Sequence, residues 1–407
     1  MYSQKIQHKI QYYLLLGIAF SLPLSKKVVP ILIILIVLNW LISGDLKSRF
    51  SNLIKPKYAF LFISFYLLHL TGLIYTSNME FGWFDMEVKL SFLIFPLVFF
   101  TSRPYSIFQM EHIKTSFIGG CLISGIILLV NGFNAYFETG DVTNLLYGKL
   151  SMDYHASYYS MYLCLALAMI MHFIFTKWEC ISSWERPLYI ISMPVFLVLI
   201  VLLMAKSGFI TLVFVIFSAL IFLLFSKKFG QALILFTSVL IFAFAIVHII
   251  PESKIRINKA IDVFTSYSGD INPNAIESTA ERLLIWPVAM ELIKEHPLIG
   301  VGTGDIKDEL ISKYKDKSLS GVYDEGLNAH NQFLQTFAAL GIFGFLSLCL
   351  GLVLPLVHSF RQSNFIYAML IMIIIINALT ESILEVQAGV IFYAFFNSLF
   401  MFLYPDK

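Results

Sequence analysis

The sequence predicts an all-α polytopic membrane protein with about twelve transmembrane helices and one long loop of short helices outside the membrane. Of the 407 residues, 58% are hydrophobic and only 13% are charged. A soluble domain carries about 25% charged residues, so this composition excludes a soluble protein. The apolar residues gather in runs near the length of about 20 that crosses a bilayer as a helix. A single long polar stretch interrupts these runs late in the chain.

The apolar runs divide the chain into three parts. Residues 1–250 form an N-terminal transmembrane bundle of about nine spans, residues 251–337 form the polar loop, and residues 338–407 add about three more spans. The weakest spans are the first, which contains Pro23, and the fourth, which contains Lys89 and Pro96. The expected spans are 9–25, 28–43, 57–76, 87–101, 112–133, 154–176, 187–204, 208–226, 230–250, 338–359, 365–380 and 388–404.

The N-terminal stretch has a basic start and an apolar run but no small-residue cleavage site, and it leads directly into another span. It is therefore expected to be a first helix and not a removed signal. The four cysteines show no CxxC spacing, so we expect neither a disulfide nor a metal site among them. The net charge of +2 reflects membrane topology and gives no sign of a nucleic-acid partner.

Lysine and arginine are concentrated in alternate short loops, which predicts that both chain ends are cytoplasmic. The pair Lys26 and Lys27 violates this pattern, because it falls on the outer side. In this topology the polar loop 251–337, the turn at Lys206 and the segment 380–387 all face the same, outer side. The unusual polar residues are therefore expected on one surface.

Arg282 lies near the start of the polar loop, where the pattern predicts a helix that runs to about Glu295 and ends before Pro297. A guanidinium group is a planar fork that matches phosphate oxygens, so one interpretation is a clamp for a diphosphate. The other interpretation is a surface arginine at the bilayer face, paired with lipid phosphate. The residue alone does not separate the two.

Lys206 occurs in LLMAKSGFITL, between two long apolar runs with almost no loop. A charge at the bilayer centre costs roughly 2.5–3.5 kcal/mol, whereas a lysine at the end of a span reaches the interface at little cost. Ser207 and Gly208 leave room beside the lysine, and its turn lies on the same side as Arg282. We therefore favour a functional lysine over one that only marks a span end.

His330 occurs in NAHNQF, before an amphipathic apolar run. Asn328 is the expected N-cap, which would place His330 in the first turn of a helix. Histidine exchanges protons near neutral pH and is a candidate general base, although a lone histidine is more often an interfacial side chain. Asn328 and Asn331, together with His155 at an aromatic-rich entry to a span, are candidates for an acceptor or sugar site.

Residues 300–304 read GVGTG, which is neither a P-loop nor a dinucleotide-binding fingerprint. We favour chain reversal over phosphate contact for this turn, with Asp305 capping the next segment. Glu381 and Glu385 lie between the last two spans and are candidates for general bases or for positioning a histidine or an incoming sugar. No HExxH or DxD spacing occurs in the outer loops, so we expect neither a metal nor a cofactor.

Residues 282–286 read RLLIW, residues 296–305 read HPLIGVGTGD, and residues 329–344 read AHNQFLQTFAALGIFG. These motifs, in this order and with this layout of spans, resemble the O-antigen ligase and polymerase superfamily over most of the chain. The turn at residues 205–208 is similar to the place where that family carries a Ser-Arg-Gly-like motif.

The resemblance implies a glycosyltransferase of the bacterial inner membrane with its active site on the periplasmic side. Such enzymes take a glycan from undecaprenyl diphosphate and pass it to a hydroxyl of a lipid A-core sugar, without a metal and with inversion of the anomeric centre. The essential arginine of the family falls on Arg282 and its essential histidine on His330. Its arginine at the turn falls on Lys206, where lysine keeps the charge but loses the bidentate fork.

Several alternatives remain open at this point. A polymerase uses the same donor with a carrier-linked glycan as acceptor, and a protein O-oligosaccharyltransferase uses serine or threonine. A lipid or glycan transporter would carry mid-membrane charges and an inverted repeat, of which the sequence shows few and none respectively. A membrane scaffold would leave the arginine, the glycine turn and the histidine without a role. The expected partners are the lipid-linked donor, the acceptor and membrane lipid.

Overall fold

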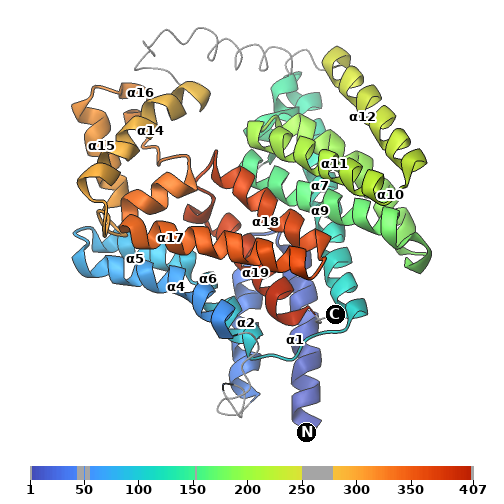
Figure 1. Cartoon of the computed structure of the whole chain (residues 1–407). Coiled ribbons are helices and arrows are strands. Elements are labelled where there is room, and N and C mark those ends of the chain that lie inside the picture. The colour runs from blue at the N-terminus through green and yellow to red at the C-terminus, as the bar shows by residue number, and fades with distance from the viewer. Residues whose placement is uncertain (1, 44–49, 51–55, 152–153, 250–277, 405–407) are drawn as a thin grey trace.

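The computed structural model describes residues 2–43, 50, 56–151, 154–249 and 278–404, and all regular elements in these ranges are helical (Figure 1). The main helices are α1 (Tyr2–Ser21), α2 (Val28–Ile42), α4 (Pro56–Gly72), α5 (Met79–Lys89), α6 (Ser91–Phe100), α7 (Ile107–Thr139), α8 (Tyr147–Ser151), α9 (Ala156–Thr176), α10 (Glu185–Leu203), α11 (Lys206–Phe225), α12 (Phe229–Ile249), α14 (Ser278–Glu295), α15 (Ile306–Asp316), α16 (Ser320–Asp324), α17 (Gln332–Arg361), α18 (Phe365–Ala378) and α19 (Gln387–Ser398).

Six of these helical segments are long and apolar enough to cross a membrane: Tyr58–Tyr75, Ile107–Thr139, Ala156–Thr176, Glu185–Leu203, Lys206–Phe225 and Gln332–Arg361. Shorter apolar helices add Val28–Ile42, Phe229–Ile241, Phe365–Ala378 and Gln387–Leu403. This set indicates a polytopic membrane protein, as the composition predicted. The first and fourth expected spans are not in either group. The fourth is divided at Leu90 between α5 and α6, which carry Lys89 and Pro96.

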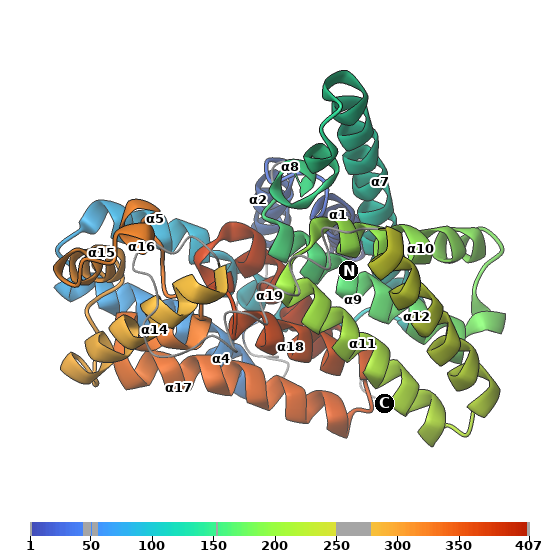
Figure 2. The same ribbon diagram turned by 90° about the horizontal axis from the view of Figure 1, so that it is seen from above.

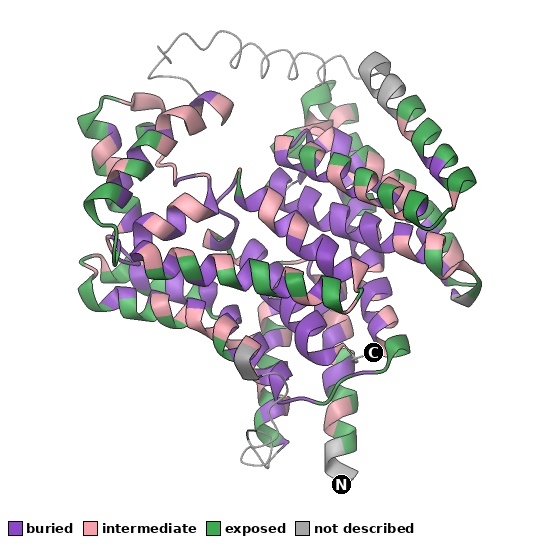
Figure 3. Cartoon of the chain, in the orientation of Figure 1, coloured by how far each residue is buried: buried purple, intermediate pink, exposed green. Residues whose placement is uncertain are grey.

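Helix α9 forms the centre of the main bundle and packs against α7, α10, α11 and α18. Almost all of its residues are buried, which fits a helix that is apolar around its whole circumference (Figure 3). Gly208 lets α11 approach α9 closely, because a Cβ at this position would lie 2.6 Å from the Cβ of Ser160. The first turn of α11, which carries Lys206, is thereby held against the first turn of α9.

The outer helices present apolar side chains to their surroundings. On α11, Ile210, Val213 and Phe217 are 52%, 66% and 59% exposed, at the spacing of one helix face. An exposed apolar stripe of this kind is expected where a helix contacts lipid. Figure 3 shows that exposed residues line the outer side of α10, α11 and α12, whereas the central α9, α18 and α19 are mostly buried.

The polar loop folds as short helices over one end of the bundle, as the sequence predicted for its described residues 278–331. Helices α14, α15 and α16 share a second apolar core with the start of α17. Both views place these helices on the side of α5, away from α10, α11 and α12 (Figures 1 and 2). The part of the loop at residues 251–277 lies outside the described residues.

The glycine-rich turn fastens this second core to α17. Gly341 interrupts α17 with a positive φ of 63°, and the amides of Val301 and Gly302 donate to the carbonyls of Ala338 and Ala339 just before that break, both at 2.9 Å. A Cβ on Gly300 would lie 2.4 Å from the backbone of Ala339. Because the carbonyls of α17 occupy these amides, the turn reverses the chain and does not present them to phosphate.

Asp305 occupies the N-cap position of α15, as the sequence predicted, but its side chain does not act as the cap. Asp305 precedes α15, but its carboxylate makes no cap hydrogen bond to that helix. It accepts instead from the amide of Asn78 at 2.7 Å and from the amide of Ser77 at 2.8 and 3.0 Å. A carboxylate satisfies unpaired amides wherever the chain brings them, and here it binds the amides of the turn before α5 and not those at the start of α15.

Candidate functional site

One carboxylate joins the two residues that the sequence singled out in the polar loop. Glu381 Oε1 accepts from Nη2 of Arg282 at 2.9 Å, and Glu381 Oε2 lies 2.9 Å from Nδ1 of His330. The three residues come from α14, the turn before α17 and the segment after α18. The side chains are 15%, 24% and 11% exposed for Arg282, His330 and Glu381 respectively. Partly buried charge-assisted contacts of this kind are stronger than surface ion pairs.

Arg282 is placed by the helix that the sequence predicted, since α14 runs from Ser278 to Glu295 and tolerates Pro287 in its interior. The guanidinium also donates through Nε to the carbonyl of Thr380 at 2.9 Å. It therefore contacts both the backbone and the side chain of the segment that carries Glu381. This fixes the start of α14 against the end of α18.

The local structure around His330 differs from the prediction. The N-cap of α17 is Asn331, whose Oδ1 accepts from the amides of Phe333 and Leu334, so His330 precedes the helix. Its φ is +43°, a left-handed conformation that costs about 1–3 kcal/mol for a residue with a Cβ. The side-chain oxygen of Asn328 accepts from the amide of His330 at 3.0 Å and that of Gln335 accepts from the amide of Ala329 at 3.0 Å.

Asn328 and Asn331 thus hold the turn that contains His330 in a conformation that a regular helix start would not give. Asn331 also donates through Nδ2 to the carbonyl of Leu379 at 3.1 Å, which ties the turn to the end of α18. The two asparagine side chains make these contacts within the protein. Their expected part in a sugar site stays a prediction.

The carboxyl of Glu381 is ionised, as its contacts with two donors require. Burial raises the pKa of its carboxyl, but the hydrogen bond to His330 and the charges of His330 and Arg282 lower it by more, so the net pKa is below the ordinary value. The carboxyl is therefore ionised at neutral pH and acts only as an acceptor. Nδ1 of His330 must then carry the proton, which leaves Nε2 as its basic nitrogen.

Lys206 lies next to the same helix turn as Arg282. Its Nζ donates to Oγ1 of Thr279 at 2.6 Å, and Thr279 is one turn before Arg282 on α14. Residues three apart on a helix share a face. The structure therefore brings Lys206, Arg282 and His330 to one region, although they are far apart in the sequence.

The start of α9 forms another edge of this region. Ser157 Oγ lies 3.5 Å from Glu381 Oε1, and His155 caps α9 by accepting from the amide of Ser157 through Nδ1 at 3.4 Å. His155 itself is exposed, between the rings of Tyr147 and Tyr158. The predicted candidate His155 is therefore near Glu381 but does not share its hydrogen bonds.

Glu385 is turned away from Arg282 and His330 into a second group of polar residues. Its Oε2 accepts from Nζ of Lys89 at 2.7 Å and its Oε1 accepts from Nε2 of Gln332 at 2.8 Å. Lys89 also binds Asp85, one turn earlier on α5. In the sequence Lys89 stood out only as a charge within an expected span, and neither Asp85 nor Gln332 was predicted to have a role. The four-residue spacing of an acid and a lysine in DMEVK was the signal available.

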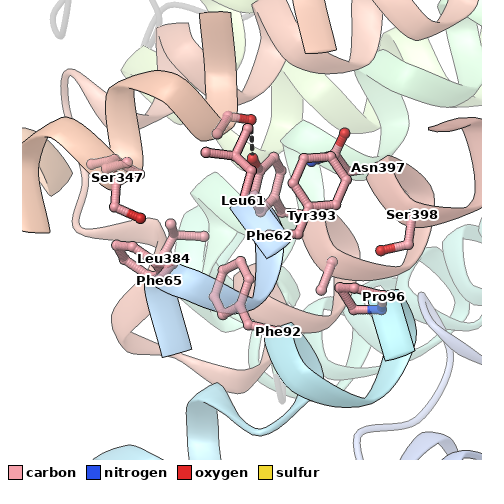
Figure 4. Close-up of a pocket in the computed structure, with 13 residues that line it drawn as sticks. Leu61, Phe62, Phe65, Phe92, Pro96, Ser347, Leu384, Tyr393, Asn397 and Ser398 are labelled. Carbon is pink, nitrogen blue, oxygen red and sulfur yellow. Dashed lines mark hydrogen bonds between the residues drawn. The ribbon is translucent and has the colours of Figure 1, made fainter. Parts of the chain in front are cut away.

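A small apolar cavity, which Leu384 lines next to Glu385 in the sequence, lies between α4, α6, α17 and α19 (Figure 4). Its walls are mainly aromatic and aliphatic, with Phe65, Phe92 and Leu384 among them, and Asn397 and Ser398 are among the few polar groups. Ligand pockets that take apolar molecules have walls of this character, although they are larger.

Comparison with known proteins finds similarity over part of the chain. A sequence model described as O-antigen ligase matches residues 192–349, a range that includes Lys206, Arg282 and His330. A protein of Haemophilus influenzae described as uncharacterized is 25% identical over 142 residues, which cover 34% of this chain and 35% of that protein. The chain thus aligns with about a third of that relative's length. Residues 192–349 of this polytopic membrane protein are thus similar to the O-antigen ligase family.

Proposed function

We propose that the protein is a membrane glycosyltransferase of the O-antigen ligase type. It transfers a glycan from undecaprenyl diphosphate to a hydroxyl of a lipid A-core sugar at the periplasmic face of the bacterial inner membrane. The observation that carries the proposal is the contact of Arg282 and His330 with the single carboxylate of Glu381, with Lys206 one helix turn away. In this proposal the catalytic part is the loop 251–337, completed by Glu381 from the C-terminal part.

The reaction needs cations where the diphosphate leaves. As the bond between the anomeric carbon and the diphosphate oxygen breaks, the electron pair goes to that oxygen and the negative charge on the leaving group grows. Positive groups that are already in place stabilise such charge most effectively at a site of low exposure. Arg282 and Lys206 supply them from the starts of α14 and α11. Lipid diphosphate is a good leaving group when its charge is neutralised, so no general acid is required.

The acceptor hydroxyl needs a base. Its oxygen forms the new bond to the anomeric carbon and its proton passes to Nε2 of His330, the basic nitrogen left by the contact between Nδ1 and Glu381. Glu381 then stabilises the imidazolium, because the carboxylate is ionised and in contact with the ring. A single displacement of this kind inverts the anomeric centre.

The apolar cavity supports a lipid substrate. Its walls are mainly apolar, and Leu384 joins them to the segment of Glu381 and Glu385, but the cavity is too small for a carrier chain. We assign it no step in the chemistry.

The test is transfer by the purified protein. It is incubated with a lipid-diphosphate glycan and with three acceptors in parallel: lipid A-core, a second carrier-linked glycan and a serine-containing peptide, with and without a chelator. We expect transfer to lipid A-core. Transfer only to the glycan would identify a polymerase, and transfer only to the peptide a protein glycosyltransferase. Flux of the glycan across liposomes without a new glycosidic bond would replace the proposal by a transporter.

Two variants test the assigned residues. Arg282→Ala and His330→Ala should each abolish transfer while the protein remains folded in the membrane. His296→Ala is the matched control, because His296 is an exposed histidine of the same loop at the end of α14. Normal transfer by a folded Arg282→Ala or His330→Ala variant would reject the role given to that residue.

A further inference from the structure

The second group of polar residues, formed by Asp85, Lys89, Gln332 and Glu385, contains a lysine that is completely removed from solvent. Lys89 is 0% exposed, and its Nζ binds the carboxylates of Asp85 and Glu385. Nδ1 of His69, from α4, lies 3.5 Å from the other oxygen of Asp85. Lys89 thus connects α5 to the segment between α18 and α19.

Burying these charges costs free energy, so the group is a poor means of holding helices together. Removing charges from water carries a penalty that their mutual attraction often fails to recover, and well-packed apolar residues can replace a buried ion pair without loss of stability. Ionisable residues buried among membrane helices are rare and usually serve function. Stability alone therefore does not explain why α5 carries an acid and a lysine here.

The group is joined to the site through Gln332. Gln332 is fully buried, it follows His330 by two residues, and it makes two contacts to the segment of Glu381. Its Nε2 donates to Glu385 Oε1 at 2.8 Å, and its Oε1 accepts from the amide of Leu384 at 2.7 Å. Gln332 thus fastens the segment that presents His330 to the segment that presents Glu381, two residues after His330 and three to four residues after Glu381.

We infer that Lys89 is a positioning residue, which holds Glu385 and, through Gln332, sets the contact between Glu381 and His330. The inference rests on the proposed function for its catalytic consequence. Lys89 touches neither Arg282 nor Lys206, and those cations are held by α14 and α11. Loss of Lys89 therefore changes the base and its partner, and leaves the cations for the diphosphate in place.

The experiment compares two buried lysines. Lys89→Met removes the residue of interest. Lys114→Met is the matched control, because Lys114 is 2% exposed and pairs with Glu111 at 2.8 Å. It lies over the rings of Phe173 and Tyr404, at the end of α9 opposite to Ser157.

Both variants should lose thermal stability, but only Lys89→Met should lower kcat, by about 10²-fold, as expected when a reacting group is misplaced by about 1 Å. The KM for the donor should stay within about twofold, since the cations are unchanged. A third variant guards against simple misfolding. Adding Asp85→Asn and Glu385→Gln to Lys89→Met removes the uncompensated buried charges, and this triple variant should recover the thermal stability of the wild type but not its kcat.

A second measurement does not depend on transfer. Amide hydrogen exchange in residues 379–386 should be faster in Lys89→Met than in the wild type, and unchanged in Lys114→Met. Unchanged exchange in both, or a triple variant with the kcat of the wild type, would overturn the inference. If the wild-type protein transfers no glycan, the proposed function fails, while the exchange measurement still decides whether Lys89 fixes this segment.

Discussion

Replacing the carboxylate of Glu381 by an amide tests the centre of the proposed site. In the wild type the two oxygens have different main donors, Arg282 and His330, both at 2.9 Å, with Ser157 Oγ at 3.5 Å from the oxygen that Arg282 binds. Glu381→Gln keeps the size of the side chain but leaves one oxygen for two donors. The amide nitrogen must then face either the guanidinium or the imidazole N–H, and that donor loses its partner.

The magnitude follows from one lost charge-assisted hydrogen bond. Such a bond contributes about 1.5–3 kcal/mol, and each 1.36 kcal/mol is a factor of ten in rate, so kcat/KM should fall about 10- to 150-fold. If the lost contact is the one to His330, the fall lies in kcat, because the base is no longer oriented or stabilised when it takes the proton. If it is the one to Arg282, the KM for the donor rises instead.

The assay measures initial rates of glycan transfer over a range of donor concentrations, with thermal unfolding of each purified variant measured alongside. Glu309→Gln is the control, because Glu309 is an exposed glutamate of α15 and an exposed substitution changes stability by less than about 0.5 kcal/mol. A folded Glu381→Gln protein with the kcat and KM of the wild type would refute the assignment of Glu381 as the partner of the catalytic base.

Three further predictions follow from particular contacts. Lys206→Met should raise the KM for the donor about tenfold, because one charge-assisted contact of roughly 1.5 kcal/mol is lost. Lys206→Arg keeps the charge, so its KM should stay close to that of the wild type. Equal KM values for all three proteins would remove Lys206 from the diphosphate site. Gly300→Ala should lower the free energy of unfolding by about 2–4 kcal/mol, because φ is +71° and the new Cβ meets the backbone of Ala339. Gly148→Ala is the control and should change the free energy of unfolding little, because nothing lies within 4 Å of its Cβ. Thermal unfolding compares the two variants, and a Gly300→Ala protein as stable as the wild type would contradict the close packing. The pKa of Glu381 is lowered in the folded protein, so its ionised form stabilises the fold above the unfolded pKa of about 4.3, and this stabilisation is lost as pH falls through the folded value. The difference in unfolding temperature between the wild type and Glu381→Gln should therefore shrink as pH falls below about 4. A difference that grew below about pH 4 would contradict the lowered pKa.

The sequence alone determined the class of the protein and the positions of most helices. Apolar runs must form helices in a bilayer because each backbone amide and carbonyl needs a partner within its own segment. That requirement is local, so α9, α11, α14 and α18 lie close to where the runs placed them. The residue types Arg282 and His330 also stood out without coordinates, since few charges and polar turns occur among so many apolar residues.

Only the tertiary structure decided what these residues contact. Glu381 is 51 positions from His330 and 99 from Arg282, and Lys89 is 296 positions from Glu385. No periodicity links residues so far apart, because their contact depends on how the helices pack and not on any one helix. The left-handed turn at His330 and the capture of the Asp305 carboxylate by the turn before α5 have the same origin. A polar group leaves its local partner when packing brings it to an unsatisfied one elsewhere, and the positions of those groups are known only once the chain has folded.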